Sequence, residues 1–276
     1  MIFSSLLLAA APCFATAHCA PQDRREVVME TYHALAKIED LEGLADLWKQ
    51  NRGLVLQTID ADLEGGLSLW EKSPEKPPVA EISALQTRAM FGARAASLAF
   101  SQPIFTDYAS SFVGWDNAQK QAFRAGQQVY GRAAKELKDG NHETAFEAGK
   151  ETVERASALG DWWGTAMGYG AQAEAARNLG WFEDALVAYG MARQINHALG
   201  LEYSEYRNLQ GMLAASRAAE RDPRSLVIAT DLAAYARAFA DTPILKTTLS
   251  AKAQLEEKLG HTSAATKTKD ELSTLK

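Results

Sequence analysis

The strongest candidate for metal chemistry in this sequence is the segment 141–146, which reads Asn-His-Glu-Thr-Ala-Phe. A zinc-binding helix of the H-E-x-x-H type needs two histidines four residues apart, because both must reach one metal ion from the same helix face. Phe146 stands in the place of the second histidine. We therefore predict no metal site at the four histidines in the body of the chain, none of which has a cysteine or histidine neighbour at ligand spacing: His33, His142, His197 and His261.

Other catalytic patterns are also missing from the sequence. It contains no glycine-rich phosphate loop, no nucleophile elbow and no dinucleotide-binding fingerprint. Gly164, Gly168 and Gly170 alternate with large residues inside a predicted helix, so we expect them to be sites of close helix packing. Adjacent carboxylates such as Glu256 and Glu257 are typical of a solvated helix face. We predict a protein that is not an enzyme and needs no cofactor.

The composition favours a folded helical protein that does not bind nucleic acid. Apolar residues make up 47% of the 276 residues, and only 8 are proline. Alanine is abundant, and alanine, leucine and the long polar residues lose little free energy on entering a helix. The net charge is −6, and no cluster of Lys and Arg is present. Since nucleic-acid binders present a basic face, we predict no nucleic-acid partner.

The first seventeen residues differ from the rest of the chain. They carry no charge, and residues 2–11 are almost all apolar. Ala15 and Ala17 are small residues at the two positions that a signal peptidase recognises, although no Lys or Arg follows Met1. We predict a signal peptide, residues 1–17, and export to the periplasm or outside the cell. The alternatives are an uncleaved N-terminal membrane anchor or a start further along the chain.

No stable membrane insertion is expected once the signal is removed. The first apolar run is short for a transmembrane helix, and no later segment approaches its length. Cys13 would leave with the signal, and Cys19 would remain without a partner for a disulfide. Attachment of a lipid to Cys19 stays open, although His18 fits a lipoprotein cleavage site poorly. The fold must therefore depend on packing alone.

The chain repeats itself with a period of 40 residues. Gly140 and Gly180 are 40 residues apart, and Gly260 lies on the same lattice. Leu199-Gly200 repeats Leu159-Gly160. A fixed period of this length is typical of stacked helical repeats. Two further columns hold mostly small residues at the same spacing: Ala145, Ala185, Ser225 and Ala265, and Ala133, Ala173, Leu213 and Ala253.

Each period is predicted to contain two helices. Apolar residues at helical spacing extend over 163–179, and Gly180 follows, as a residue that readily takes the left-handed conformation at a helix end. A second apolar stripe begins at Phe182 and ends before Leu199-Gly200. Short connections oblige neighbouring helices to run antiparallel. The fold class is therefore predicted to be all-α, a solenoid of antiparallel helix pairs with an N-terminal helical region.

Aromatic and small residues alternate from Tyr169 to Ala192 on either side of the turn at Gly180. This arrangement resembles the tetratricopeptide (TPR) family over residues ~115–275, which implies a right-handed solenoid. Ala176 stands where the family usually has Tyr, and His197 where a Pro often ends the unit. The period exceeds the usual 34 residues or so, so we expect the second helix to be longer by more than a turn. HEAT-type repeats are the alternative. The residues that carry the resemblance are Tyr169, Ala173, Gly180, Phe182, Ala185, Tyr189 and Ala192.

The N-terminal half does not keep the 40-residue register. A segment with three prolines, between Lys72 and Val79, is the clearest linker in the chain. We expect this half to be divergent helix pairs packed on the first repeat, or else a separate small bundle. The predicted organisation is an N-terminal helical region at 18–72, a linker at 73–79, connecting helices at 80–114, and repeats at 115–276.

Aromatic residues are concentrated around one repeat. Trp162, Trp163 and Trp181 are predicted to cluster beside Tyr169 and Phe182. A core between helices is the first interpretation of this cluster. The functional alternative is an apolar binding patch near the turn between units.

The resemblance to TPR proteins also implies a binding surface. In that family the first helix of each pair lines the concave surface, where ligands are held. Basic and amide groups on that face suit an acidic peptide or a C-terminal peptide. The predicted function is therefore a non-enzymatic scaffold that docks a protein or peptide partner. The candidate residues are Gln127, Tyr130, Lys138, Glu174, Arg177, Asn178, Arg207, Gln210 and Arg217.

Two alternatives come from other classes of function. The first is a small-molecule-binding protein or enzyme whose site lies between the N-terminal helices and the solenoid. A deep pocket with a buried Asp, Glu or His near Trp48, Trp70 or Trp115 would favour it. The second is a self-assembling structural element. The sequence predicts neither the partner nor the oligomeric state.

Overall fold

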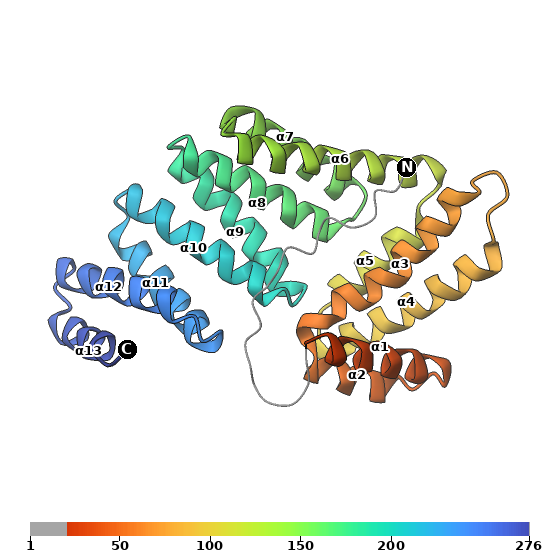
Figure 1. Ribbon diagram of the computed structural model, residues 1–276, viewed down its shortest axis with the longest axis horizontal. Coiled ribbons are helices and arrows are strands. Elements are labelled where there is room, and N and C mark those ends of the chain that lie inside the picture. Colours follow the sequence, from red (N-terminus) through yellow and green to blue (C-terminus); the bar gives the residue numbers. More distant parts are fainter. Residues whose placement is uncertain (1–20, 276) are drawn as a thin grey trace.

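A computed structural model of the chain describes residues 21–275 (Figure 1). Within this range it contains thirteen α-helices, one short 3-10 helix and no β-strand. The prediction of an all-α, solenoid-like fold is confirmed. None of the described helices is long and apolar enough to cross a membrane. The predicted signal peptide and both cysteines lie outside the described residues.

The N-terminal region, residues 21–114, is an irregular bundle arranged around α4, which packs against α1, α2, α3 and α5. Asp40 begins α2 by accepting a hydrogen bond from the backbone N–H of Gly43. The proline-rich segment predicted as a linker joins α3 to α4, two helices that pack on each other. The elements are α1 Pro21–Lys37, α2 Leu41–Gln50, η1 Arg52–Leu54, α3 Val55–Lys72, α4 Val79–Phe100 and α5 Ile104–Gly114.

The repeat array, residues 117–274, is far more regular. Each helix from α7 to α12 has 17 residues. The 40-residue period therefore consists of two equal helices, and the expectation of a longer second helix is wrong. The helices are α6 Asn117–Asp139, α7 His142–Ala158, α8 Trp162–Asn178, α9 Phe182–Ala198, α10 Glu202–Ala218, α11 Asp222–Ala238, α12 Thr242–Lys258 and α13 Thr262–Thr274.

Every turn of the array ends a helix in the same way. Each turn contains one residue with a positive φ, and the next backbone N–H bonds back to a carbonyl in the last helical turn, as in Trp181 N to Ala176 O at 2.9 Å. Glycine suits this conformation because it has no Cβ. The turns at Glu220 and Ala240 adopt it without glycine, with φ of 56° and 53°.

Glycines inside the helices have different packing roles. A Cβ on Gly149 would lie 2.7 Å from the backbone nitrogen of Gln172, and one on Gly168 would lie 2.9 Å from that of Val153. These two glycines therefore let α7 and α8 approach closely, as expected for Gly168. Gly170 has no atom within 4 Å of its Cβ position, so its prediction as a close-packing site is wrong.

The predicted aromatic cluster does not form as one group. Trp162 and Trp163 begin α8 and pack against the core of the N-terminal region. Trp181 follows the other end of α8 and contacts the ring of Phe146 edge-on, at 5.2 Å between centroids. A helix of 17 residues is about 25 Å long, which separates the two groups.

Candidate binding surface

The first helices of successive pairs form one layer of the array. α8 packs against α6 on one side and α10 on the other, in addition to its contacts with α7 and α9 (Figure 1). All nine candidate residues belong to α6, α8 and α10. We call the surface that they make the first-helix surface.

Three of the nine candidates lie close together on this surface. Arg177 forms an ion pair with Glu174, one helical turn away. Burial alone would raise the pKa of Glu174. Hydrogen bonds from Arg177 and Tyr189, together with the positive charges of Arg177 and Arg207, hold that pKa below its ordinary value. Glu174 is therefore an ionised carboxylate that orients one arginine beside another.

Sequence reasoning missed the role of Tyr189 in this group. Tyr189 belongs to α9, yet its hydroxyl donates a hydrogen bond to Glu174 on α8. Its ring lies against Gly211 of α10, where a Cβ would overlap the ring carbon that bears the hydroxyl. A glycine in the interior of a helix, aligned with a buried tyrosine in the preceding helix, is the signal that could have indicated this contact.

The other six candidates are spread over the surface. Lys138 and Asn178 are exposed near the ends of their helices, and Tyr130 is half-buried in a small apolar cluster. Arg217 reaches the side-chain oxygen of Gln254 on α12, at 3.4 Å. The last two candidates contact other polar side chains. Gln127 bonds to Arg124, and Gln210 bonds to Tyr206.

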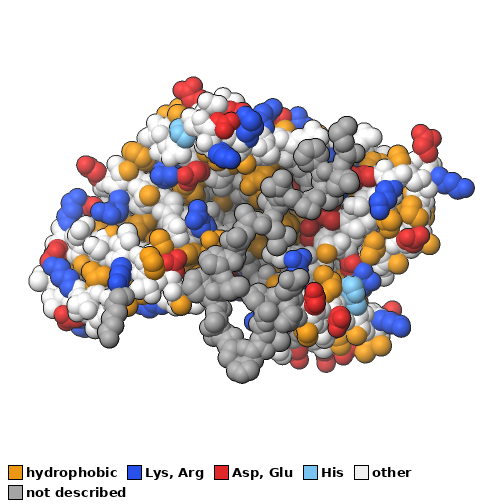
Figure 2. Space-filling model, in the orientation of Figure 1, with side chains coloured by type: hydrophobic (Ala, Val, Ile, Leu, Met, Phe, Trp, Pro, Cys, Tyr) orange, Lys and Arg blue, Asp and Glu red, His pale blue; other side chains and the backbone are white. Residues whose placement is uncertain are grey.

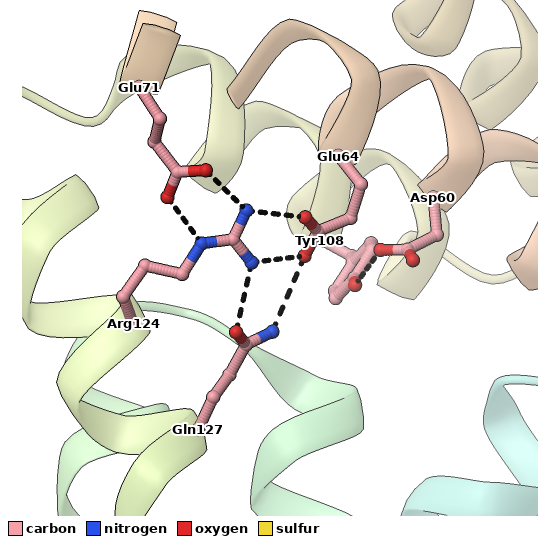
Figure 3. A network of polar contacts seen from close by, with 6 residues as sticks. All are labelled: Asp60, Glu64, Glu71, Tyr108, Arg124 and Gln127. Carbon is pink, nitrogen blue, oxygen red and sulfur yellow. Dashed lines mark hydrogen bonds and ion pairs between the residues drawn. The ribbon is translucent and has the colours of Figure 1, made fainter. Parts of the chain in front are cut away.

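A polar network joins the N-terminal region to the repeat array (Figure 3). Arg124 of α6 forms ion pairs with two carboxylates of α3, at 2.8 Å from Glu64 and 2.6 Å from Glu71. Gln127 accepts a hydrogen bond from Arg124 at 2.9 Å. The partners are more than fifty residues apart in the chain, so no local pattern predicted this network.

Beside this network, Asp60 accepts a hydrogen bond of 2.6 Å from the buried hydroxyl of Tyr108 (Figure 3). Burial raises the pKa of Asp60 to about 7, and the negative charges of Glu64 and Asp161 add to the shift. The hydrogen bond from Tyr108 and the charge of Arg124 oppose it. Asp60 is thus a carboxyl group that binds a proton near neutral pH.

Asp161 shares this property on the side of the repeat array. It caps α8 by accepting a hydrogen bond from the backbone N–H of Gly164 at 2.8 Å. Burial raises the pKa of Asp161 to about 6, the hydrogen bond from Gly164 lowers it, and the charge of Glu64 raises it further. Two carboxyl groups with raised pKa values therefore meet where the N-terminal region contacts the array.

The N-terminal region also lies against two turns of the array. The indole N–H of Trp115, the residue that follows α5, donates to the carbonyl of Leu159 at 2.9 Å, and Arg52 donates to the carbonyl of His197 at 2.9 Å. The glycine of each turn is in close contact with the same region, Gly200 with Arg52 itself. We call the row of turns after α7, α9 and α11 the turn edge.

A small pocket lies near Trp70 and Trp115, where the alternative hypothesis located a site. Its volume is about 20 Å³, which has room for a single water molecule but is far below the size of a ligand pocket. The indole N–H of Trp70 is buried there without a hydrogen-bond partner. Among the described residues, no group of three or more His, Cys, Asp or Glu side chains could hold a metal ion.

The fold defines a class, an all-helical solenoid-like array with an N-terminal bundle on its turn edge. A comparison with models of known protein families finds no match, and a search of characterised proteins finds no similar sequence.

Proposed function

We propose that the protein is a non-enzymatic interaction module of the TPR-like class, which docks a partner on the first-helix surface. The pattern of the array supports the class. Ala173 and Ala185 are fully buried where α8 and α9 pack, and Tyr189 is buried behind them. This is the alternation of small and aromatic residues on which the resemblance rests.

The group of Glu174, Arg177 and Arg207 carries the proposal of a binding role. The ion pair with Glu174 orders the side chain of Arg177, which reduces the entropy lost when a ligand binds. Arg207 is exposed next to this pair. Two arginines beside one carboxylate leave a net positive charge, which suits the carboxylate of an acidic peptide or of a chain terminus.

Export from the cytoplasm remains part of the proposal. It rests on the uncharged apolar residues 1–17 alone. Cleavage after Ala17 would be detected by N-terminal sequencing of the protein isolated from the producing cell.

The test of the docking role is affinity capture after crosslinking in cells. The mature chain is compared with a variant in which Arg177, Arg207 and Arg217 are replaced by Ala. We expect a partner that the wild type captures and the variant loses. Equal capture by both would remove the first-helix surface from consideration.

A matched control variant loses three positive charges at other positions. Arg155, Arg221 and Arg224 are exposed residues outside the first helices, and their replacement by Ala should leave capture unchanged. Circular dichroism of both variants must show wild-type helicity. Loss of the partner in the control as well would indicate a general effect of charge.

One observation favours the second candidate function, a small-molecule site between the two regions. Asp60 and Asp161 combine burial with raised pKa values of about 7 and about 6, as acid–base groups in active sites do. A thermal-shift screen of small molecules against the wild type and Asp60→Asn tests it. A compound that stabilises only the wild type would support the second candidate, and equal shifts in both proteins would count against it.

A further inference from the structure

Equivalent positions form the turn edge in successive repeats, but the N-terminal region packs against only part of this edge. In the repeat formed by α8 and α9, the edge positions are Trp163, Ala166, Ile195 and Leu199. All four pack in the core that includes the N-terminal region. Arg52 of that region completes the cover by donating to a carbonyl at the end of α9. This part of the edge is therefore an interface within the chain.

Forty residues later, the same four positions are all aromatic: Tyr203, Tyr206, Tyr235 and Phe239. Their rings contact one another, with centroids 5.2 Å apart for Tyr206 and Phe239 and 6.2 Å apart for Tyr203 and Phe239. We call these residues the aromatic edge cluster. Tyr206, Tyr235 and Phe239 belong to the core of the array, which includes no residue of the described N-terminal region.

Three of the four side chains of the aromatic edge cluster reach solvent, whereas Tyr206 is buried beneath them. Tyr203 is 52% exposed, and Tyr235 and Phe239 are only half-buried. The corresponding Leu199 is completely buried. A surface that continues an interface with four aromatic side chains, and that lacks the cover of that interface, is the kind of surface that receives a partner.

Carboxylates surround this cluster and define the charge of its ligand. Burial raises the pKa of Tyr235. The hydrogen bond to Glu205 and the negative charges of Glu205 and Glu202 raise this pKa further. Asp241 accepts a hydrogen bond from the hydroxyl of Tyr206 at 2.8 Å. Two basic side chains are paired with Glu205, Arg193 and His197, and Arg193 is also paired with a carboxylate of α11.

The excess of negative charge argues against a second copy of the chain as the occupant, because two such surfaces would bring like charges together. It favours an apolar segment that carries Lys or Arg. The covered part of the edge provides the precedent. There the guanidinium of Arg52 lies 5.1 Å from the centre of the Phe100 ring and donates to the helix end at His197.

We propose that the aromatic edge cluster is a second docking surface, which binds an apolar helical segment with flanking arginine or lysine from a partner protein. The partner would continue, along α10 and α11, the interface that the N-terminal region makes with α7 to α9. The cluster contains none of the nine candidates of the first-helix surface, so this site is independent of the proposed function.

The test uses two synthetic helical peptides labelled with a fluorophore. Both have leucine and phenylalanine on one face, and they differ only in flanking arginines or flanking glutamates. Fluorescence anisotropy with the full mature chain should show binding of the arginine peptide about tenfold tighter than the glutamate peptide. Equal binding of the two peptides, or no binding of the arginine peptide, would overturn the proposal.

Exposed substitutions then locate the site without disturbing the core. Tyr203→Ser should weaken binding of the arginine peptide about tenfold, and Glu202→Gln should weaken it less. Val187→Ser removes another exposed apolar side chain, 65% accessible on α9, and should leave binding unchanged. Equal binding by the wild type and Tyr203→Ser would overturn the assignment to this cluster.

Two further measurements separate the alternatives. Arg207→Ala disrupts the first-helix surface and should not affect the arginine peptide. Weaker binding by that variant would assign the peptide to the first-helix surface and overturn the proposal. Sedimentation of the wild type should show a monomer across concentrations, and a dimer that Tyr203→Ser dissociates would establish a second copy as the occupant instead.

Discussion

The N-terminal region and the repeat array solve the same packing problem with different residues. The N-terminal region has helices of unequal length around large buried side chains, among them Tyr32, Trp48 and Phe105. In the array, α7 to α12 have equal length, with fully buried alanines such as Ala173 and Ala185 where they meet. Small residues at equivalent positions permit a constant spacing, whereas large side chains fill the uneven gaps of an irregular bundle.

The repeat also lets the array vary its surface charge without a change in its core. Figure 2 shows basic and acidic side chains interspersed over the visible face of the helices. In the array, a repeated helix pair presents equivalent positions every 40 residues, so a surface column can differ in charge while the core stays constant. The four predictions that follow test this contrast, from the largest expected effect to the smallest.

Replacement of Trp48 should show how far the N-terminal region depends on a few large side chains. Trp48 is completely buried, and its indole N–H donates to the carbonyl of Gly92 at 3.0 Å. Trp48→Ala removes these contacts and leaves a cavity, which costs about 3–5 kcal/mol. Urea unfolding should report this loss in the free energy of unfolding, and a change below about 1 kcal/mol would refute the contrast.

The contact between the two regions should depend on pH through Asp60. Its pKa is raised from 3.8 to about 7 in the folded protein, so its contribution to stability is complete below pH 3.8 and is lost as the pH rises through 7. Asp60→Asn removes this loss. At roughly 1.4 kcal/mol per pKa unit, the free energy of unfolding of the variant should rise by about 2–4 kcal/mol relative to that of the wild type between pH 4 and pH 8.

The measurement is urea unfolding of both proteins at several pH values. The intensity of tryptophan fluorescence follows the unfolding, since indoles lie on both sides of the contact. A constant difference between the two proteins across this pH range would contradict a raised pKa at Asp60.

The small residues of the array should tolerate no enlargement where helices touch. Gly211→Ala places a Cβ against the ring of Tyr189, and such overpacking typically costs about 1–3 kcal/mol. Gly190→Ala is the matched control, because this glycine is also helical and has nothing within 4 Å of its Cβ position. The free energy of unfolding of the control should rise by up to about 1 kcal/mol. Thermal or urea unfolding distinguishes the two, and equal effects would show that the close approach is not needed.

The smallest effect is expected at the turns that lack glycine. Ala240 and Glu220 hold the left-handed conformation with a side chain present. Ala240→Gly and Glu220→Gly should therefore each stabilise the array by about 0.5–1 kcal/mol. Ala219→Gly serves as the control, since Ala219 has an ordinary φ of −81° and should lose stability. A loss of stability in the two turn variants would contradict the role assigned to the turns.

The sequence by itself determined the helices of the array and their order. Glycine at 140, 180 and 260 indicated the turns, and apolar residues at helical spacing indicated the buried faces, because both effects act between residues close together in the chain. It also placed Glu174 and Arg177 one helical turn apart on α8, where the structure pairs them. The expectation of a longer second helix came from the usual period of the family, whereas the apolar stripes at 163–179 and from Phe182 to Leu199 already indicated two helices of similar length.

Only the tertiary structure decided how the two regions meet. Arg52 bonds to His197 across 145 residues, and Arg124 bonds to Glu64 across 60. No periodicity connects such partners, since their proximity follows from the combined packing of many helices. The raised pKa of Asp60 and the open aromatic edge cluster have the same origin. Each depends on what covers a side chain, and the fold of the whole chain determines that cover.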